Sequence, residues 1–395
     1  MRIRRCSVLL LEPREDSAFD LASLLAGGDG LRRTTRWIAL APHLGEEVEV
    51  DAAERELLGA LSPARWSESR DLDSALRPAL RRLLKQGLVI GATRAHAAHR
   101  ARDERLRDSH WHPLAATLHA FTRWRDVDAM RSLEDSGLTT ARALCDTLGA
   151  PPPATTTRAD ATARVALPRP PATAFDALLG RRATCRNFDT ARALPLAACA
   201  QLLHRVFGAQ AQVRIGDDAV FVKKHSPSGG GLHPIEAYLV VQRVDGLAPG
   251  LYRYDPLAHA LDALPWQGDA AALRAFALRA VAGQAWFADA QVLALLAPRY
   301  ARAFWKYRRH PKAWRVVALE AGHLSQTLYL AATEAGLGAF VTGAINEVAL
   351  EDAFGLDPAC EGVLAVCGFG WRAAVQEAPE FDPAGAVWEA APSDP

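Results

Sequence analysis

A stretch dense in small residues has the clearest chemical content in this sequence. It runs Ser-Pro-Ser-Gly-Gly-Gly from Ser226 to Gly231, and the chain becomes apolar again within a few residues. Glycine has no Cβ, so main-chain amides of such a loop can come close to a flat, polar ligand. No Lys-Ser or Lys-Thr follows the glycines and no dinucleotide fingerprint is present, which disfavours a nucleotide P-loop and a Rossmann NAD site. A flexible surface turn is the alternative interpretation.

A lysine beside a tyrosine, Lys306-Tyr307, is the second feature. The chain has 46 basic residues, but only Lys85, Lys223, Lys224, Lys306 and Lys312 are lysines. Lysine can release its proton, whereas arginine stays charged. The pair therefore suggests acid/base chemistry, with burial and neighbouring cations favouring the neutral amine. The alternative is a charged helix end with an aromatic contact.

Three polar residues, Arg182, Thr184 and Arg186, are spaced two apart. On an extended segment this spacing places all three side chains on one face. Two guanidinium groups with a hydroxyl between them suit a phosphate and the carbonyl oxygens of a ring. An exposed edge strand is the alternative. Taken together, the three features suggest a redox cofactor with an acid/base pair beside it.

The elements that must position these residues follow an α+β pattern. Apolar runs predict strands over 237–242, 250–255, 291–297 and 362–368. Helical spacing predicts helices over 175–179, 194–207 and 314–335. The order lacks the regular alternation of a parallel doubly wound sheet, so a mostly antiparallel central sheet flanked by helices is expected.

A Pro-, Ala- and Thr-rich segment, 149–173, divides the chain. Such a composition buries too little apolar surface to order itself and predicts a linker. The expected organisation is an N-terminal region over 1–148, a main domain over 174–380 and a flexible tail over 381–395.

Within the N-terminal region, Cys6–Glu12 is strand-like. Asp51 can cap a helix beginning near Ala52, and a second helix ends at Gly87 before another apolar run. This order is typical of winged-helix modules, and a small helical cap packed on the main domain is the alternative. The segment 111–124 predicts a docked helix whose histidines pack rather than bind metal.

Composition excludes several classes of function. The formal net charge is +1, which gives no support to binding of nucleic acid or a membrane surface. The six cysteines are scattered, without the close spacing of a zinc site, so no metal is expected. The N-terminal apolar run is too short for a signal peptide, and no stretch approaches a membrane span. A reduced, cytoplasmic protein is expected.

Five motifs in order resemble the FMN-dependent nitroreductase superfamily. They are Arg-Ala-Thr-Cys-Arg-Asn-Phe from Arg182, the Pro-Ser-Gly-Gly loop, Gly-Leu-Tyr-Arg-Tyr-Asp-Pro from Gly250, Lys306-Tyr307, and Leu-Glu-Ala-Gly-His-Leu-Ser-Gln from Leu319. The last four are similar to one branch, the SagB-type azoline dehydrogenases of ribosomal peptide maturation. The resemblance covers about Phe175 to Gly370, roughly half of the chain.

The resemblance implies bound FMN shared between two subunits of a homodimer, with Lys306 and Tyr307 as catalytic residues. The cofactor-binding residues that it implies are Arg182, Thr184, Arg186, Ser226, Pro227, Ser228, Gly229, Gly230, Thr342, Gly343, Ala344 and Arg372. Two departures stand out. Many members have a basic pair near the C-terminus where only Arg372 follows the last strand, and the turn over 341–344 fits the family pattern loosely.

The activity that the resemblance implies is oxidation of a residue or azoline ring, thiazoline or oxazoline to azole, in a ribosomally made peptide. A base removes one proton while hydride leaves the adjacent carbon. The implied partners are a precursor peptide and cyclase-type modifying enzymes. Two alternatives stay open: an NAD(P)H-dependent flavin reductase of dehydroamino acids or of nitro and quinone compounds, and a non-catalytic flavoprotein subunit that scaffolds a peptide-modifying complex.

Overall fold

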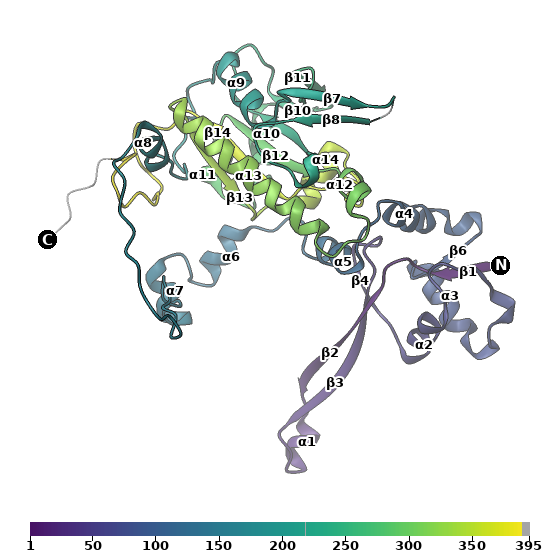
Figure 1. Ribbon diagram of the computed structural model, residues 1–395. Helices are drawn as coiled ribbons and strands as arrows, with labels where there is room; N and C mark the ends of the chain where they lie inside the picture. Colours follow the sequence, from purple (N-terminus) through teal and green to yellow (C-terminus); the bar gives the residue numbers. More distant parts are fainter. Residues whose placement is uncertain (218, 389–395) are drawn as a thin grey trace.

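The centre of the molecule is a six-stranded antiparallel sheet (Figure 1). The computed structural model describes residues 1–217 and 219–388. The strands are β9 (Ile235–Val241), β10 (Gly250–Asp255), β11 (Ala260–Leu264), β12 (Val292–Pro298), β13 (Gly338–Thr342) and β14 (Ala365–Gly370). Their order is β11-β10-β9-β12-β14-β13, and every neighbouring pair is antiparallel. The predicted α+β architecture is therefore confirmed.

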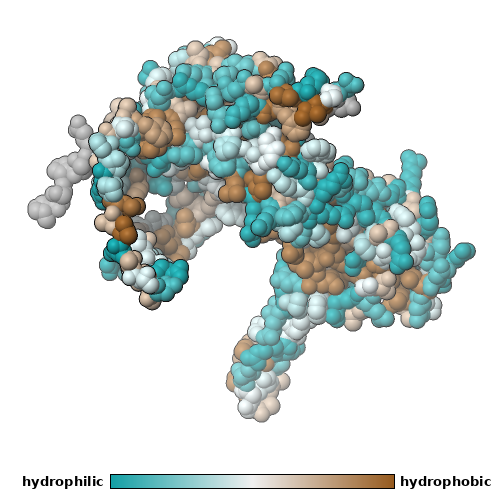
Figure 2. Space-filling view, in the orientation of Figure 1, coloured by the Kyte–Doolittle hydropathy of each residue, from teal (hydrophilic) through white to brown (hydrophobic). Residues whose placement is uncertain are grey.

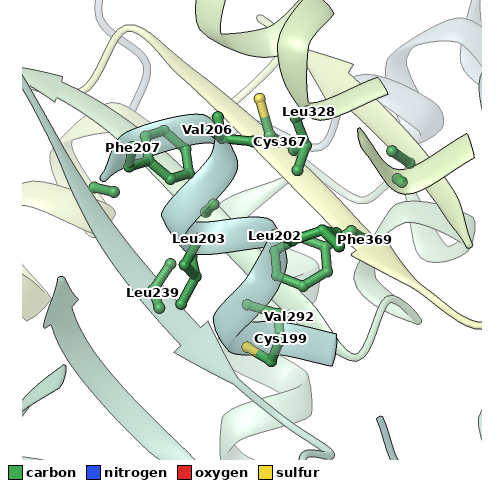
Figure 3. Packing of buried hydrophobic residues seen from close by; sticks show 14 of the residues in the cluster. Cys199, Leu202, Leu203, Val206, Phe207, Leu239, Val292, Leu328, Cys367 and Phe369 are labelled. Carbon is green, nitrogen blue, oxygen red and sulfur yellow. The ribbon is translucent and has the colours of Figure 1, made fainter. Parts of the chain in front are cut away.

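Helices cover both faces of this sheet. Helices α9 (Leu196–Phe207) and α13 (Ala313–Glu334) pack on one face, and α9 places Leu202, Val206 and Phe207 in a core shared with the strands (Figure 3). On the other face lie α10 (Ala270–Ala280), α11 (Ala285–Ala288) and α14 (Glu347–Phe354). All seven residues of β12 are buried because both faces of the sheet are covered.

The main-domain elements agree with the predicted ones within a few residues. The largest shift is in the last strand, expected over 362–368 and found at β14, because pairing with β12 places Phe369 opposite Val292. Elements that the sequence did not suggest include the hairpin of β7 (Ala211–Ile215) and β8 (Ala219–Lys223).

The N-terminal region has its own small sheet, in the order β5-β1-β6. Its strands are β1 (Arg2–Arg5), β5 (Ser67–Glu68) and β6 (Val89–Gly91), and helices α2 (Ala52–Ala60) and α3 (Arg77–Gln86) share a core with them. The predicted cap is confirmed, since Asp51 and Glu54 form a reciprocal capping box. Gly87 ends α3 with φ +82°. The winged-helix-like prediction fits this arrangement.

The prediction of one strand over Cys6–Glu12 is wrong. Strand β1 ends at Arg5, and β2 (Leu10–Phe19) begins a separate hairpin with β3 (Leu31–Leu40). The Cys6 N–H still donates to the Leu88 carbonyl in the β1–β6 register, and the chain leaves the ladder at Ser7, whose N–H donates to the buried Asp103 carboxylate. The hairpin is rich in charge, which concealed its strands, and it extends away from the body (Figure 1).

The remaining elements complete the connection. They are α1 (Leu21–Leu25) at the hairpin tip, β4 (Glu47–Glu49), α4 (Ala97–Asp108), α5 (Pro113–Phe121), α6 (Ala129–Asp135), α7 (Ala141–Leu148), α8 (Ala174–Gly180), α12 (Tyr300–Tyr307), and the 3₁₀ turns Ser69–Asp71, Ser74–Leu76, Arg94–His96 and Gly229–Gly231. Residues 149–173 are exposed and form no helix or strand. Among the described residues, no helix is both long and apolar enough to span a bilayer.

The segment before α5 docks firmly on the main domain. The Trp111 ring lies 4.5 Å from Tyr300 and 4.8 Å from Phe304, both on α12, measured between centroids. Its indole N–H donates to the Ala359 carbonyl at 2.8 Å. His119 stacks on Trp111 and bonds the Pro358 carbonyl, so this histidine packs as predicted.

Candidate active site

Helix α13 holds the glycine-rich loop through a row of polar side chains. The Ser226 and Thr327 hydroxyls are 2.7 Å apart, and the Ser228 hydroxyl donates to the Glu320 carboxylate. The Pro227 carbonyl lies 3.2 Å from Nδ1 of His323. Residues 320, 323 and 327 share one helix face. The loop is therefore an ordered element, and the flexible-turn interpretation does not apply to it.

Inside the loop, Gly230 and Gly231 have φ of +68° and +69°, a region that favours glycine. A Cβ built on Gly230 would lie 2.8 Å from Nζ of Lys306 and 3.0 Å from the Tyr307 hydroxyl. A Cβ on Gly229 would lie 1.9 Å from a methyl group of Val316. The fold thus brings the loop against Lys306 and Tyr307, which the chain separates by more than seventy residues.

The surroundings of the lysines differ from the expectation. Lys306 is exposed at the end of α12, so the burial invoked to favour its neutral amine is absent. Lys224, just before the loop, is the buried lysine, with 4% exposure. Burial lowers the pKa of Lys224, while the charges of Glu236 and Glu320 oppose this shift. Burial also raises the pKa of Glu320 despite the hydrogen bond from Ser228.

The arginine-bearing segment lies beside β13. Its residues alternate as expected, because Ala183 and Cys185 are buried while Arg182, Thr184 and Arg186 are half-exposed. The Cys185 N–H donates to the Ala339 carbonyl at 2.9 Å. The alternative of an exposed edge strand therefore describes only one side of this segment, because Ala183 and Cys185 on its other side are buried in the core.

Tyr329 of α13 organises this segment. Its hydroxyl is 2.9 Å from Oγ1 of Thr184 and accepts the Val341 N–H at 3.1 Å. The Arg182 guanidinium lies over the Tyr329 ring at 5.3 Å. One tyrosine thus connects the segment, the end of β13 and α13.

The turn after β13 holds Thr342, Gly343 and Ala344. The Thr342 hydroxyl accepts the Ala344 N–H at 3.2 Å, and the Gln284 amide donates to the Ala344 carbonyl at 3.0 Å. Gly343 is exposed, and a Cβ there would meet no atom within 4 Å. Hydrogen bonds therefore hold Thr342 and Ala344 in place, and Gly343 between them is exposed.

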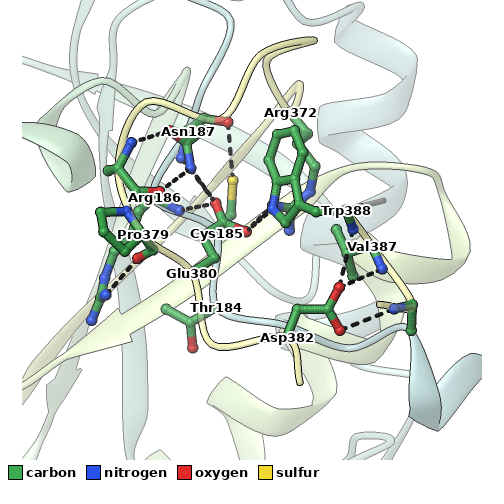
Figure 4. Close-up of polar contacts among 12 residues, drawn as sticks. Thr184, Cys185, Arg186, Asn187, Arg372, Pro379, Glu380, Asp382, Val387 and Trp388 are labelled. Carbon is green, nitrogen blue, oxygen red and sulfur yellow. Dashed lines mark hydrogen bonds and ion pairs between the residues drawn. The ribbon is translucent and has the colours of Figure 1, made fainter. Parts of the chain in front are cut away.

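Arg186 and Arg372 are both engaged by the C-terminal segment (Figure 4). The Glu380 carboxylate accepts the Arg186 N–H at 2.6 Å and the Asn187 N–H at 3.1 Å, and it pairs with the Arg372 guanidinium. Arg186 donates to the Pro379 carbonyl at 2.7 Å.

The Glu380 carboxylate is itself fully buried. Burial acts to raise the pKa of Glu380, but hydrogen bonds from Trp388, Arg186 and Asn187, with the charge of Arg372, lower it overall. The Glu380 carboxylate thus binds the main chain of Arg186 and the guanidinium of Arg372, a contact that no motif had suggested.

The predicted site residues fall into two groups on α13. Tyr329 stands two positions beyond Thr327, which is about 200° around a helix axis. The glycine loop with Lys306 and Tyr307 therefore lies on one side of α13, and Arg182 and Thr184 lie on nearly the opposite side. Within a single chain, the two groups therefore face different sides of this helix, which is about 10–12 Å across with its side chains.

Each group has features that fit part of an FMN molecule. The guanidinium groups of Arg182 and Arg186 suit the phosphate and ring carbonyls, whereas that of Arg372 already pairs with Glu380. Nε of Arg186 is buried and, among the described residues, has no hydrogen-bond partner, so it can still donate. At the loop, Gly229 and Gly230 pack against Val316, Lys306 and Tyr307, and Gly231 has open space where a Cβ would lie. The residues present therefore fit this cofactor.

A separate cleft of about 570 Å³ lies between α4, α5 and α14. Arg102, Arg123 and Glu351 are among its lining residues, and none of the predicted site residues is. Burial raises the pKa of Glu351 to about 7 against the influence of Arg123. This cleft is thus separate from the candidate active site.

Comparison with known proteins gives the family. The sequence profile of the Nitroreductase family matches residues 179–371. A Methanocaldococcus jannaschii protein named as a nitroreductase is 32% identical over 150 residues, which are 38% of this chain and 70% of that protein. The chain belongs to the nitroreductase family. The family is one of FMN-binding oxidoreductases, and the resemblance stated above is confirmed.

Two further matches concern peptide-processing proteins. The trifolitoxin-processing protein TfxB of Rhizobium leguminosarum bv. trifolii is 31% identical over 147 residues, 36% of this chain and 38% of that relative. The solved Escherichia coli microcin synthetase McbBCD complex with truncated pro-MccB17 aligns with a TM-score of 0.49 and 18% identity, covering 68% of this chain and 92% of that one.

Three residues of this nitroreductase-family site escaped sequence reasoning. Glu320 lies in a quoted motif but was given no role, and Tyr329 follows shortly after it. A helical wheel of α13 places Glu320 and Tyr329 on opposite sides of the helix. This separation was the sequence signal that could have assigned them to two different contacts. Glu380 lies in an irregular segment, and nothing in the local pattern indicates its contacts.

Proposed function

We propose that this chain is an FMN-dependent dehydrogenase that oxidises an azoline ring, thiazoline or oxazoline to azole, in a ribosomally made peptide. The observation that carries the proposal is the contact between the glycine loop and the Lys306–Tyr307 pair. The similarity to TfxB, a protein named for trifolitoxin processing, supports a peptide as the substrate. Precursor peptide and cyclase-type enzymes are the partners proposed.

Oxidation of the ring removes a proton and a hydride from adjacent ring atoms, and a double bond forms between them. When bound, FMN would supply the acceptor for the hydride. Lys306 is the proposed base that takes the proton. Tyr307, whose hydroxyl lies at the same loop, orients the ring. Ser228 and Glu320 hold the loop so that the substrate and this pair meet in a fixed geometry.

The proposal is tested with a synthetic thiazoline peptide. The FMN-loaded protein is expected to convert it to the thiazole, seen as a mass lower by two hydrogens, with NAD(P)H absent. If the protein instead reduces nitro compounds or quinones with NAD(P)H and leaves the thiazoline unchanged, the reductase alternative holds. If it is inert alone and turns over only with added cyclase-type proteins, the scaffold alternative gains support.

We further propose that the site is completed by a second copy of the chain. The glycine loop of one copy and the arginine-bearing segment of the other would then face the same cofactor. The exposed face of α13 presents Ala318, Leu319 and Gly322, and Leu319 is 63% exposed. Small and apolar residues at this spacing suit close helix packing.

A homodimer is accordingly expected in solution. Sedimentation at micromolar concentration should give twice the monomer mass. Leu319→Arg should yield a monomer that loses flavin, whereas Leu257→Arg, at another exposed leucine, should stay a dimer. A wild-type monomer with flavin still bound would contradict the shared site.

Removing the Arg182 guanidinium is expected to weaken FMN binding. Arg182→Ala should cost about 1–3 kcal/mol, the scale of a lost charge-assisted hydrogen bond. Flavin fluorescence on titration measures the change. Riboflavin, which lacks the phosphate, should bind wild type and variant alike, and an equal loss for both ligands would contradict a phosphate contact.

For the N-terminal region, 1–148, we propose binding of the precursor peptide or a partner, with 149–173 as a linker, 174–380 as the FMN domain and 381–395 as a tail. Residues 389–395 of that tail lie outside the described residues. Deleting the region would uncover Tyr300 and Phe304, so substitutions in it test this role better than truncation does.

A further inference from the structure

The β7–β8 hairpin is a two-stranded ribbon beside the candidate site. In the described part of the chain, β7 pairs with β8 alone, and all its residues are exposed, while most of β8 is half-buried. Val213 and Ile215 are each 61% exposed, and Figure 2 shows hydrophobic surface on this hairpin. A ribbon of two strands is marginally stable by itself, so a third strand would stabilise it.

The register shows which main-chain groups are free. Arg214 stands opposite Val220. The Val220 carbonyl accepts a hydrogen bond from the Arg302 side chain at 3.0 Å, so it points away from β7. Opposite residues of an antiparallel pair point their groups either both inward or both outward. The N–H and C=O of Arg214, and by the two-residue period those of Gln212, therefore face the open edge.

The hairpin is continuous with the candidate site through β8, the strand that pairs with the other side of β7. Strand β8 ends at Lys223, three residues before Ser226 begins the glycine loop. Phe221 of β8 lies 6.4 Å from the Trp305 ring, and Trp305 directly precedes Lys306. Arg302 of the same helix also donates to the Leu232 carbonyl at 2.5 Å. Helix α12 thus connects the hairpin to the residues at the loop.

We propose that an extended segment of the peptide substrate pairs with β7 as a third strand, which leads the reacting residue to Lys306 and Tyr307. This inference rests on the proposed function. Only an extended main chain offers amide groups that match the outward groups of Gln212 and Arg214. Apolar side chains would pack on Val213 and Ile215. Cationic Arg214 and Lys223 favour a segment with acidic residues.

Arg214→Pro is the first test. Proline removes the outward N–H and no hydrogen bond inside the ribbon, because Arg214 is not hydrogen-bonded to Val220. The probe is a fluorescent peptide of about ten residues with a central thiazoline and acidic flanks. We expect its Kd to rise about tenfold, the loss of one or two hydrogen bonds. Arg214→Ala, the matched control, keeps the N–H and should change the Kd less.

A scan of peptide N-methylation on the wild-type protein is the second test, and it does not depend on folding of a variant. Binding should weaken at every second amide only, because alternate amides of a paired strand face β7. Uniform weakening, or none, would overturn the proposal. So would a change from dimer to monomer in Arg214→Pro, because a second copy would then cover the edge.

The two proposals fail differently. If the peptide binds with the period-two pattern but is never oxidised, the docking surface stands and the proposed azoline chemistry fails. If the peptide is oxidised with the same Kd and KM in wild type and Arg214→Pro and the scan has no period, the chemistry stands and the docking surface is wrong.

Discussion

Lys306→Ala is expected to lower turnover of the thiazoline peptide by about 10²–10⁴-fold, the range for loss of a general base. The flavin absorption spectrum should be unchanged, because the proposed role of Lys306 is proton transfer and the proposed cofactor-binding residues stay intact. Lys306→Arg should fail almost as completely, since a guanidinium stays protonated. Steady-state kinetics with a flavin spectrum of each variant measures both effects.

Lys312→Ala is the matched control for this prediction. Lys312 is an exposed lysine at the start of α13 and should be replaceable without loss of turnover. Tyr307→Phe should be milder than Lys306→Ala if the hydroxyl only orients the ring. Near-normal turnover in Lys306→Arg would show that a positive charge suffices, and the buried Lys224 or Glu320 would be the next candidate base.

Glu380→Ala is expected to lower the free energy of unfolding by about 3–5 kcal/mol. Its carboxylate is fully buried, pairs with Arg372 and accepts the N–H groups of Arg186 and Asn187. Removing one partner of a buried pair leaves the other charge uncompensated. Urea unfolding measures the loss. Glu377→Ala, in the same segment but with an exposed side chain, is the matched control and should have little effect.

The stability that Glu380 contributes should depend on pH. Because the pKa of Glu380 is lower in the folded protein than in the unfolded chain, its contribution is fully present above the ordinary glutamate pKa. It should disappear as the pH falls through the lowered value. An equal acid sensitivity of wild type and Glu380→Gln would contradict this role for the carboxylate.

Local sequence signals predicted helix ends and the central strand well, because a single residue or one short apolar run determines each of them. Asp51 begins α2 through a capping box, Gly87 ends α3, and the apolar run of β12 marks the sheet centre. The strands of the β2–β3 hairpin escaped prediction because charged pairs such as Arg14 with Glu12 and Glu47 stand where apolar alternation would be expected.

For the candidate site, the order of the motifs indicated the candidate residues, but not that they contact different sides of α13. The separation of Thr184 from Ser226 depends on which side of α13 each contacts, a long-range property. The exposure of Lys306 and the burial of Lys224 likewise follow from tertiary packing. Nothing local to either lysine distinguishes them.

The docking of Trp111 between the N-terminal region and α12 has a mechanical consequence. Tyr300 and Phe304, which Trp111 contacts, lie six and two residues before Lys306 on the same short helix. A rigid helix that is held at one end transmits a displacement to the other. By linkage, a ligand that fixes the N-terminal region in one position also favours one position of the Lys306 amine, and a substrate bound there favours the same state of the distant region. If the N-terminal region binds the peptide as proposed, recognition of that peptide and the position of the proposed proton acceptor are in this way coupled.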